Sequence, residues 1–104
     1  MVTTEQWLAG IGKGWRPIVR PLVERAQAAG VEIHQIKEKF GGLRFYVGSA
    51  SDAFHEAIET AERHCARTCE ECGDVGKLRT GGWLKTLCDA HATGRPAVGK
   101  KDAP

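Results

Sequence analysis

The sequence has no long hydrophobic run. No stretch of about 18 or more apolar residues occurs in the chain, which excludes a membrane-spanning helix. The opening segment, MVTTEQWLAG, lacks the basic start and apolar core of a secretory signal. No internal repeat of about 20 to 50 residues is visible either. A length of 104 residues is typical of one domain. We therefore expect a cytoplasmic protein with one compact domain, over residues 1–92.

Motifs of enzymes are also lacking. The sequence has no phosphate-binding P-loop, no nucleophile elbow and no HExxH zinc motif. Some nucleases build a catalytic metal site on the hairpin and helix of a zinc finger, and they need a histidine base there. The corresponding segment in this chain, residues 77–87, contains no His, Asp, Glu or Asn. We therefore predict that the protein is not an enzyme.

Net charge is small, but the charges are unevenly distributed. The chain has 15 Lys and Arg against 13 Asp and Glu, which gives a formal charge of +2. Both ends of the chain, residues 1–50 and 77–104, are basic, whereas residues 51–76 are strongly acidic. Clustered charge of this kind favours a role in partner binding. The alternative is an ordinary solvated helix face.

The remaining composition is that of a globular protein, with 41% hydrophobic and 27% charged residues. A capping box at Thr3 predicts a short helix near Thr4. A second helix should begin near Pro17 and end at Gly30. A third is predicted from about residue 52 to 67, capped by Ser49 or Ser51. Its apolar stripe consists of Phe54, Ala57, Ile58, Ala61 and Cys65. The tail, residues 93–104, lacks apolar content, so we expect it to be disordered.

A β-hairpin is predicted in the segment VEIHQIKEKFGGLRFYVG, with a tight turn at Gly41-Gly42. This register places Phe40 opposite Leu43, Glu38 opposite Phe45, and Ile36 opposite Val47, on a mostly apolar face. The other face then carries Lys37, Lys39, Arg44 and Tyr46. A slip of one residue would exchange the two faces.

The strongest signal is a pattern of metal ligands, Cys69-x2-Cys72, then fifteen residues, then Cys88-x2-His91. Three thiolates and one imidazole suit Zn²⁺, and four protein ligands leave no open position for catalysis. Between the pairs, LRTGGWLKTL predicts a second hairpin, and Cys88 should precede a short helix. The sequence thus predicts an α+β fold. A helix-packed hairpin unit (1–67) is followed by a zinc finger (68–92) that resembles a treble clef.

Three alternatives to this zinc site remain open. The Cys-x-x-Cys pair could be redox-active, or the cysteines could form disulfides. Cys65 could replace His91 as the fourth ligand, although its place on an apolar stripe favours a core position. The finger contains few large apolar residues, so we expect it to fold only with metal. Trp83 should then pack over the site or against the preceding helix.

Three segments together, QIKEKFGGLRFY, TCEECG and GWLKTLCDAH, resemble a family of small bacterial and phage-borne proteins. The resemblance covers roughly residues 15–92. It implies that the hairpin and the finger form one compact unit and that the host is bacterial or viral. It implies no particular activity, because fingers of this type serve several functions.

Two binding functions follow as hypotheses. The first is a non-enzymatic module that docks onto a protein or nucleoprotein, such as a CRISPR-type defence complex that it would inhibit. The acidic side chains available for docking are Glu56, Glu59 and Glu62. The alternative is direct binding of DNA or RNA by basic side chains and a stacking tyrosine. The candidate residues are Lys37, Lys39, Arg44, Tyr46, Lys77, Arg79 and Lys85. The oligomeric state is not determined by any of these features.

Overall fold

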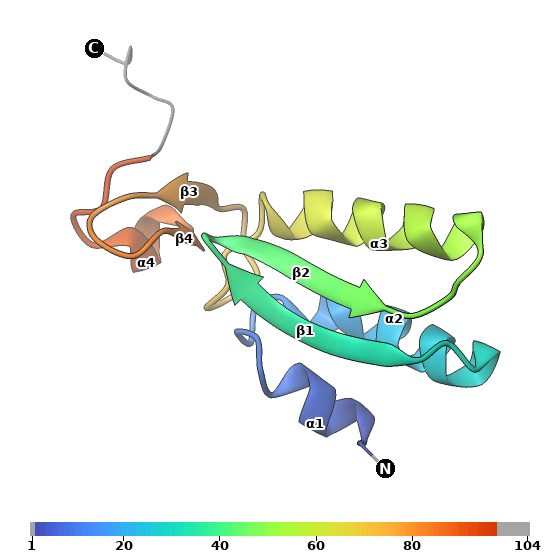
Figure 1. The fold of residues 1–104 in the computed structure, drawn as a ribbon. Coiled ribbons are helices and arrows are strands. Elements are labelled where there is room, and N and C mark those ends of the chain that lie inside the picture. Colours follow the sequence, from blue (N-terminus) through green and yellow to red (C-terminus); the bar gives the residue numbers. More distant parts are fainter. Residues whose placement is uncertain (1, 98–104) are drawn as a thin grey trace.

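Two N-terminal helices form where the sequence provides their caps. The computed structural model describes residues 2–97 (Figure 1). Helix α1 (Thr4–Leu8) begins at the predicted capping box, in which Thr3 and Gln6 bond reciprocally. Helix α2 (Arg16–Ala29) ends at Gly30, whose φ of 71° is the left-handed conformation that glycine adopts readily. No helix in this part of the chain is long and apolar enough to cross a membrane.

Strands β1 (Ile33–Lys39) and β2 (Gly42–Val47) form the predicted antiparallel hairpin, but the turn lies one residue earlier. Lys39 pairs with Gly42, so the two turn residues are Phe40 and Gly41. Both have positive φ, 55° and 80°, as a type I′ turn requires. The predicted place of Phe40 on the apolar face is therefore wrong. Its side chain is 59% exposed at the tip of the hairpin.

The two faces of the hairpin are nevertheless as predicted, because the register moves by a whole pair and each strand keeps its alternation. Ile36 lies opposite Phe45 and both are buried, as is Leu43. On the other face, Lys37 lies opposite Arg44. A bulge between Ile33 and Gln35 places Gln35 opposite Tyr46.

Helix α3 (Asp52–Cys65) begins at Ser51, whose hydroxyl accepts a hydrogen bond from the Phe54 amide. It contacts α2 and β2, while α1 contacts α2 and β1 (Figure 1). The helices thus cover the apolar face of the hairpin. The buried core between them consists of Leu8, Ile11, Trp15, Val19, Leu22, Val23, Ala26, Ile36, Leu43, Phe45, Phe54, Ile58, Ala61 and Cys65.

The C-terminal finger begins with the turn that contains Cys69 and Cys72, which we call the knuckle. The predicted hairpin and short helix follow it. Strands β3 (Lys77–Arg79) and β4 (Lys85–Leu87) pair antiparallel around a loop that contains Gly81 and Gly82. Cys88 is the N-cap of helix α4 (Asp89–Ala92). The α+β fold with a C-terminal Cys and His cluster is thereby confirmed.

The structure describes the first five residues of the predicted tail. Residues 93–97 run beside β3, where the Thr80 amide donates to the Pro96 carbonyl over 2.9 Å and Arg79 forms a bridge with Ala97. These contacts argue against disorder in residues 93–97, for which disorder was predicted. The rest of the predicted tail, 98–104, lies outside the described residues.

The finger is joined to the helix–hairpin part through close backbone contacts. The buried indole of Trp15 donates from Nε1 to the Thr68 carbonyl over 2.8 Å. A Cβ added to Gly14 would lie 2.0 Å from the Cys69 carbonyl oxygen, so only glycine fits there. On the other side, the Thr86 hydroxyl donates to the Gly41 carbonyl at the hairpin tip over 2.6 Å.

Candidate metal centre and hairpin face

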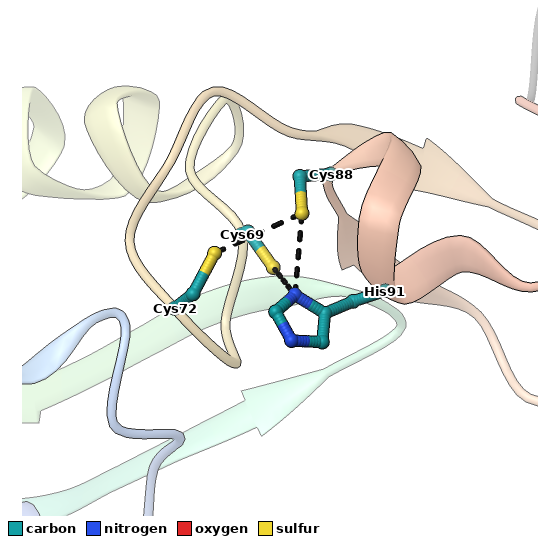
Figure 2. A group of neighbouring side chains, drawn as sticks. All are labelled: Cys69, Cys72, Cys88 and His91. Atoms are coloured by element: carbon teal, nitrogen blue, oxygen red, sulfur yellow. Dashed lines mark hydrogen bonds between the residues drawn. The ribbon is translucent and has the colours of Figure 1, made fainter.

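The four predicted ligands converge in the structure. Figure 2 shows the Cys69, Cys72 and Cys88 sulfurs and the His91 ring directed toward one point between the knuckle and α4. Their ligand atoms all lie within 4.8 Å of one another. The Cys72 and Cys88 sulfurs are 3.7 Å apart, and His91 Nδ1 is 3.2 Å from the Cys88 sulfur. This arrangement could hold a metal ion.

The two cysteines of the knuckle have different environments, which shift their pKa values in opposite directions. Burial opposes ionisation of the Cys69 thiol, but backbone amides, including those of Cys88 and Cys72, donate to its sulfur and lower its pKa to about 7. The Asp74 amide favours the Cys72 thiolate, yet desolvation and the neighbouring sulfurs raise that pKa to about 11. Hydrogen bonds to the Cys88 and Cys69 sulfurs raise the pKa of His91. A bound cation must therefore displace protons, so its affinity falls as the pH falls.

Cys65 lies apart from this cluster. It is fully buried in the core of the helix–hairpin part, and burial raises the pKa of its thiol to about 12. The alternative in which Cys65 replaces His91 has no geometric support, because His91 lies with the other three ligands. All four cysteines are free thiols, so no disulfide is formed.

A buried acidic residue, which the sequence pattern did not single out, connects the knuckle to β4. Glu70 is buried, and its carboxylate accepts a hydrogen bond from the Thr86 amide over 3.0 Å and pairs with Lys85 Nζ at 3.4 Å. The backbone of Glu70 also bonds to Thr86 and accepts from Gly14. Glu70 thereby fixes the knuckle to β4. No sequence signal indicated this role, because a charged residue between Cys69 and Cys72 is expected to be exposed.

The basic hairpin residues lie on the face that the helices leave uncovered. Lys37 and Arg44 are half-buried and directly opposite each other, while Lys39 and Tyr46 are exposed. Like charges that face each other across a strand pair destabilise a sheet. The face therefore gathers positive charge, of which the Arg44 charge is partly compensated by the nearby Glu62 carboxylate of α3.

The three basic residues predicted on the finger have different environments. Lys77 is exposed. Lys85 pairs with Glu70. Arg79, however, is 8% exposed, and its guanidinium donates to the Leu87 carbonyl over 3.0 Å and to Asp89 over 2.8 Å. This guanidinium holds β3 to β4 and α4, so little of it is exposed for the predicted contact with nucleic acid.

The three acidic residues predicted on α3 do not form one surface of equal exposure. Glu56 and Glu59 are exposed, but Glu62 is half-buried. Desolvation raises the pKa of Glu62 in spite of the nearby Arg44 guanidinium. Glu62 therefore belongs to the contact between α3 and the hairpin.

Trp83 does not pack over the metal site or the preceding helix, so that prediction is wrong. It is 69% exposed in the β3–β4 loop. The buried tryptophan that contacts the knuckle is Trp15, which the glycine-rich segment before α2 brings there. No protein-family model, curated protein or solved structure matches the chain.

Proposed function

We propose that the Cys and His cluster holds a structural zinc ion. In a tetrahedral zinc site, two sulfurs lie about 3.8 Å apart, and a sulfur and a nitrogen about 3.6 Å apart, given the usual bond lengths. The 3.7 Å between the Cys72 and Cys88 sulfurs fits this geometry. So does the 3.7 Å between the Cys69 sulfur and His91 Nδ1. Soft thiolates with one imidazole favour zinc over magnesium or calcium.

Four protein ligands would fill the coordination shell of the ion. No position is then left for a reactive water, so this zinc would have a folding role and not a catalytic one. We expect one tightly bound zinc per chain in freshly purified, reduced protein, measured by elemental analysis. Well under one equivalent would rule out this assignment.

We further propose that the protein is a non-enzymatic module whose hairpin face binds nucleic acid directly. The observation that carries this proposal is the placement of Lys37 opposite Arg44, with Lys39 and Tyr46 on the same uncovered face. The repulsion between the two cations is relieved when a phosphate binds between them. An exposed tyrosine, 43% accessible here, can stack on a base.

Docking onto a protein or nucleoprotein, including a defence complex, remains the second candidate. The exposed carboxylates of Glu56 and Glu59 favour it, because they could meet a basic groove. The half-buried position of Glu62 weakens it, because one of the three predicted docking residues is used within the fold.

A salt titration distinguishes the two candidates. Fluorescence anisotropy with labelled oligonucleotides, from about 50 to 200 mM salt, measures the number of phosphate contacts. Changing Lys37, Lys39 and Arg44 together to Ala should weaken binding and flatten the salt dependence by roughly two to three units of slope. Charge reversal at Glu56 and Glu59 is the matched control and should leave the slope unchanged. A flat titration of the wild type with every oligonucleotide would remove the nucleic-acid proposal and favour docking.

A further inference from the structure

The β3–β4 loop presents a large aromatic side chain to solvent. Trp83 is 69% exposed, and no side-chain hydrogen bond of its indole is recorded within residues 2–97. The loop backbone is held by Arg95, whose guanidinium donates to the Gly81 carbonyl over 3.3 Å and also to the Trp83 carbonyl. The backbone at Trp83 is thus held while its indole stays outside the core, which is how a binding anchor is presented.

Arg95 places a positive charge beside the loop that carries this tryptophan. In the part of the chain that the structure describes, no carboxylate lies within ion-pair distance of its guanidinium. The Nε atom of Arg95 is buried and has no hydrogen-bond partner. A guanidinium whose partners are only carbonyls can accept an anionic group, and phosphate matches its forked donors well.

The loop is connected to the tip of the first hairpin. Thr86, three residues after Trp83, bonds through its hydroxyl to the Gly41 carbonyl. Phe40 is exposed at that tip, with Lys39 Nζ lying 5.6 Å from the centre of its ring. The finger strand that follows the Trp83 loop therefore contacts the hairpin tip, where Phe40 and Lys39 lie.

From these observations we infer that Trp83 and Arg95 form a stacking and phosphate site for single-stranded nucleic acid. A base would stack on the indole while the guanidinium meets the adjoining phosphate. Single strands are the chemistry that fits, because their bases are free to stack on an exposed ring, whereas duplex bases are already stacked on one another. This inference rests on the proposed binding of nucleic acid by the hairpin face and specifies the form of the strand.

The test compares Trp83→Leu with Trp83→Phe in the full chain. The probes are a labelled oligothymidylate of about 12 nucleotides and its duplex with oligoadenylate. The wild type should prefer the single strand. Trp83→Leu should weaken single-strand binding about 5- to 150-fold, the loss of one stacked base, while the salt slope stays the same. Trp83→Phe should retain most of the affinity.

Val75→Ala is the matched control, because Val75 is 82% exposed on the same finger but outside this loop. It should bind like the wild type. Zinc content and circular dichroism must be unchanged in every variant, as expected for side chains this exposed. Single-strand binding should also quench wild-type tryptophan fluorescence. Trp83→Phe should abolish that quenching, because Trp15 is buried and Trp7 packs against the core from α1, in the other part of the molecule.

The outcomes separate this inference from the proposed function. If the wild type binds both probes and Trp83→Leu binds equally well, the stacking site is overturned while the hairpin proposal stands. If Trp83→Leu loses single-strand affinity but the triple alanine variant of the hairpin does not, the hairpin proposal fails instead. If Trp83→Leu affects only association with an acidic protein, the loop is a protein contact and the inference is overturned.

Discussion

The two parts of this molecule are held together by different forces. The helix–hairpin part buries a continuous set of large apolar side chains, among them Trp15 and Phe54, between its helices and its hairpin. Within the described residues, the buried apolar cluster of the finger is small and consists of Cys69, Leu87, Cys88 and Ala92, and two of these are proposed zinc ligands. Burial stabilises the first part at roughly 25 cal/mol per Å² of apolar surface, whereas the second has little such surface to bury. A metal bound by the Cys and His cluster would therefore provide most of the stability of the finger.

The parts are nevertheless joined, and the joint is polar. A carbonyl of the knuckle accepts from Trp15, and a carbonyl of the hairpin tip accepts from Thr86. The buried Glu70 lies between them and bonds to Thr86 as well. Loss of the finger would leave these groups without their partners, which costs about 1–3 kcal/mol for each buried group. The stability of the finger and that of the helix–hairpin part are thus coupled through these hydrogen bonds.

The largest effect is expected from removing a metal ligand. Cys69→Ser should abolish tight zinc binding, because a structural zinc site contributes on the order of 10 kcal/mol of apparent binding free energy. Hydrogen exchange should then show loss of protection in β3 and β4, while amides of α2 and α3 remain protected by the hydrophobic core.

Cys65→Ala is the control for this change, because Cys65 is buried in the other part. It should retain one equivalent of zinc and lower only the stability of the helix–hairpin core. Loss of zinc from Cys65→Ala would contradict the assignment of His91 as the fourth ligand. Complete unfolding of Cys69→Ser would instead show that neither part is stable without the other.

A smaller effect is expected at the joint. Trp15→Phe keeps a buried aromatic ring but removes the hydrogen bond to the Thr68 carbonyl. The unsatisfied carbonyl and the smaller ring should lower the free energy of unfolding by about 1–3 kcal/mol. Denaturant titration monitored by circular dichroism measures this change.

The same variant shows how tightly the two parts are coupled. Because Trp15 contacts the residue before Cys69, its replacement should also increase the rate of zinc loss to a chelator. Trp7→Phe, a change of the same kind at a half-buried position in α1, should leave that rate unchanged. Equal rates of zinc loss in all three proteins would show that the joint does not transmit stability to the metal site.

Local signals in the sequence predicted much of the fold. The Thr3 capping box, Gly30 and Ser51 mark helix ends because caps act within one turn. The spacing of Cys69, Cys72, Cys88 and His91 predicted the cluster because each pair spans one knuckle or one helical turn. The hairpin faces could be predicted from strand alternation even though the turn was misplaced.

Features that depend on distant contacts could not be predicted in this way. The burial of Arg79 depends on Leu87 and Asp89, which only the folded hairpin brings to it. Trp83 was expected inside because tryptophan is usually buried, but the space near the knuckle is filled by Trp15, far away in sequence. Hydrophobicity alone does not predict whether Trp15 or Trp83 packs against the knuckle.

The smallest expected effect concerns the turn where the two parts meet. Phe40 adopts a φ of 55°, which is unfavourable for a bulky residue, and its ring is mostly exposed. Asn-Gly is the preferred pair for this turn type. Phe40→Asn should therefore raise the free energy of unfolding by about 1 kcal/mol, or about 4–8 °C in Tm for a domain of this size.

The same substitution should weaken nucleic-acid binding if Phe40 contacts the bound single strand. Strained residues are often found at functional sites. Oligothymidylate affinity, measured by anisotropy, should then fall while stability rises, and the two measurements move in opposite directions. Gly30→Asn provides a control, because Gly30 is also left-handed but lies at the end of α2 with open space around it. Its replacement should change stability slightly and leave affinity as it was. If Phe40→Asn gains stability and keeps full affinity, Phe40 has no part in binding nucleic acid. Trp83 of the finger is then the aromatic contact that remains from this inference.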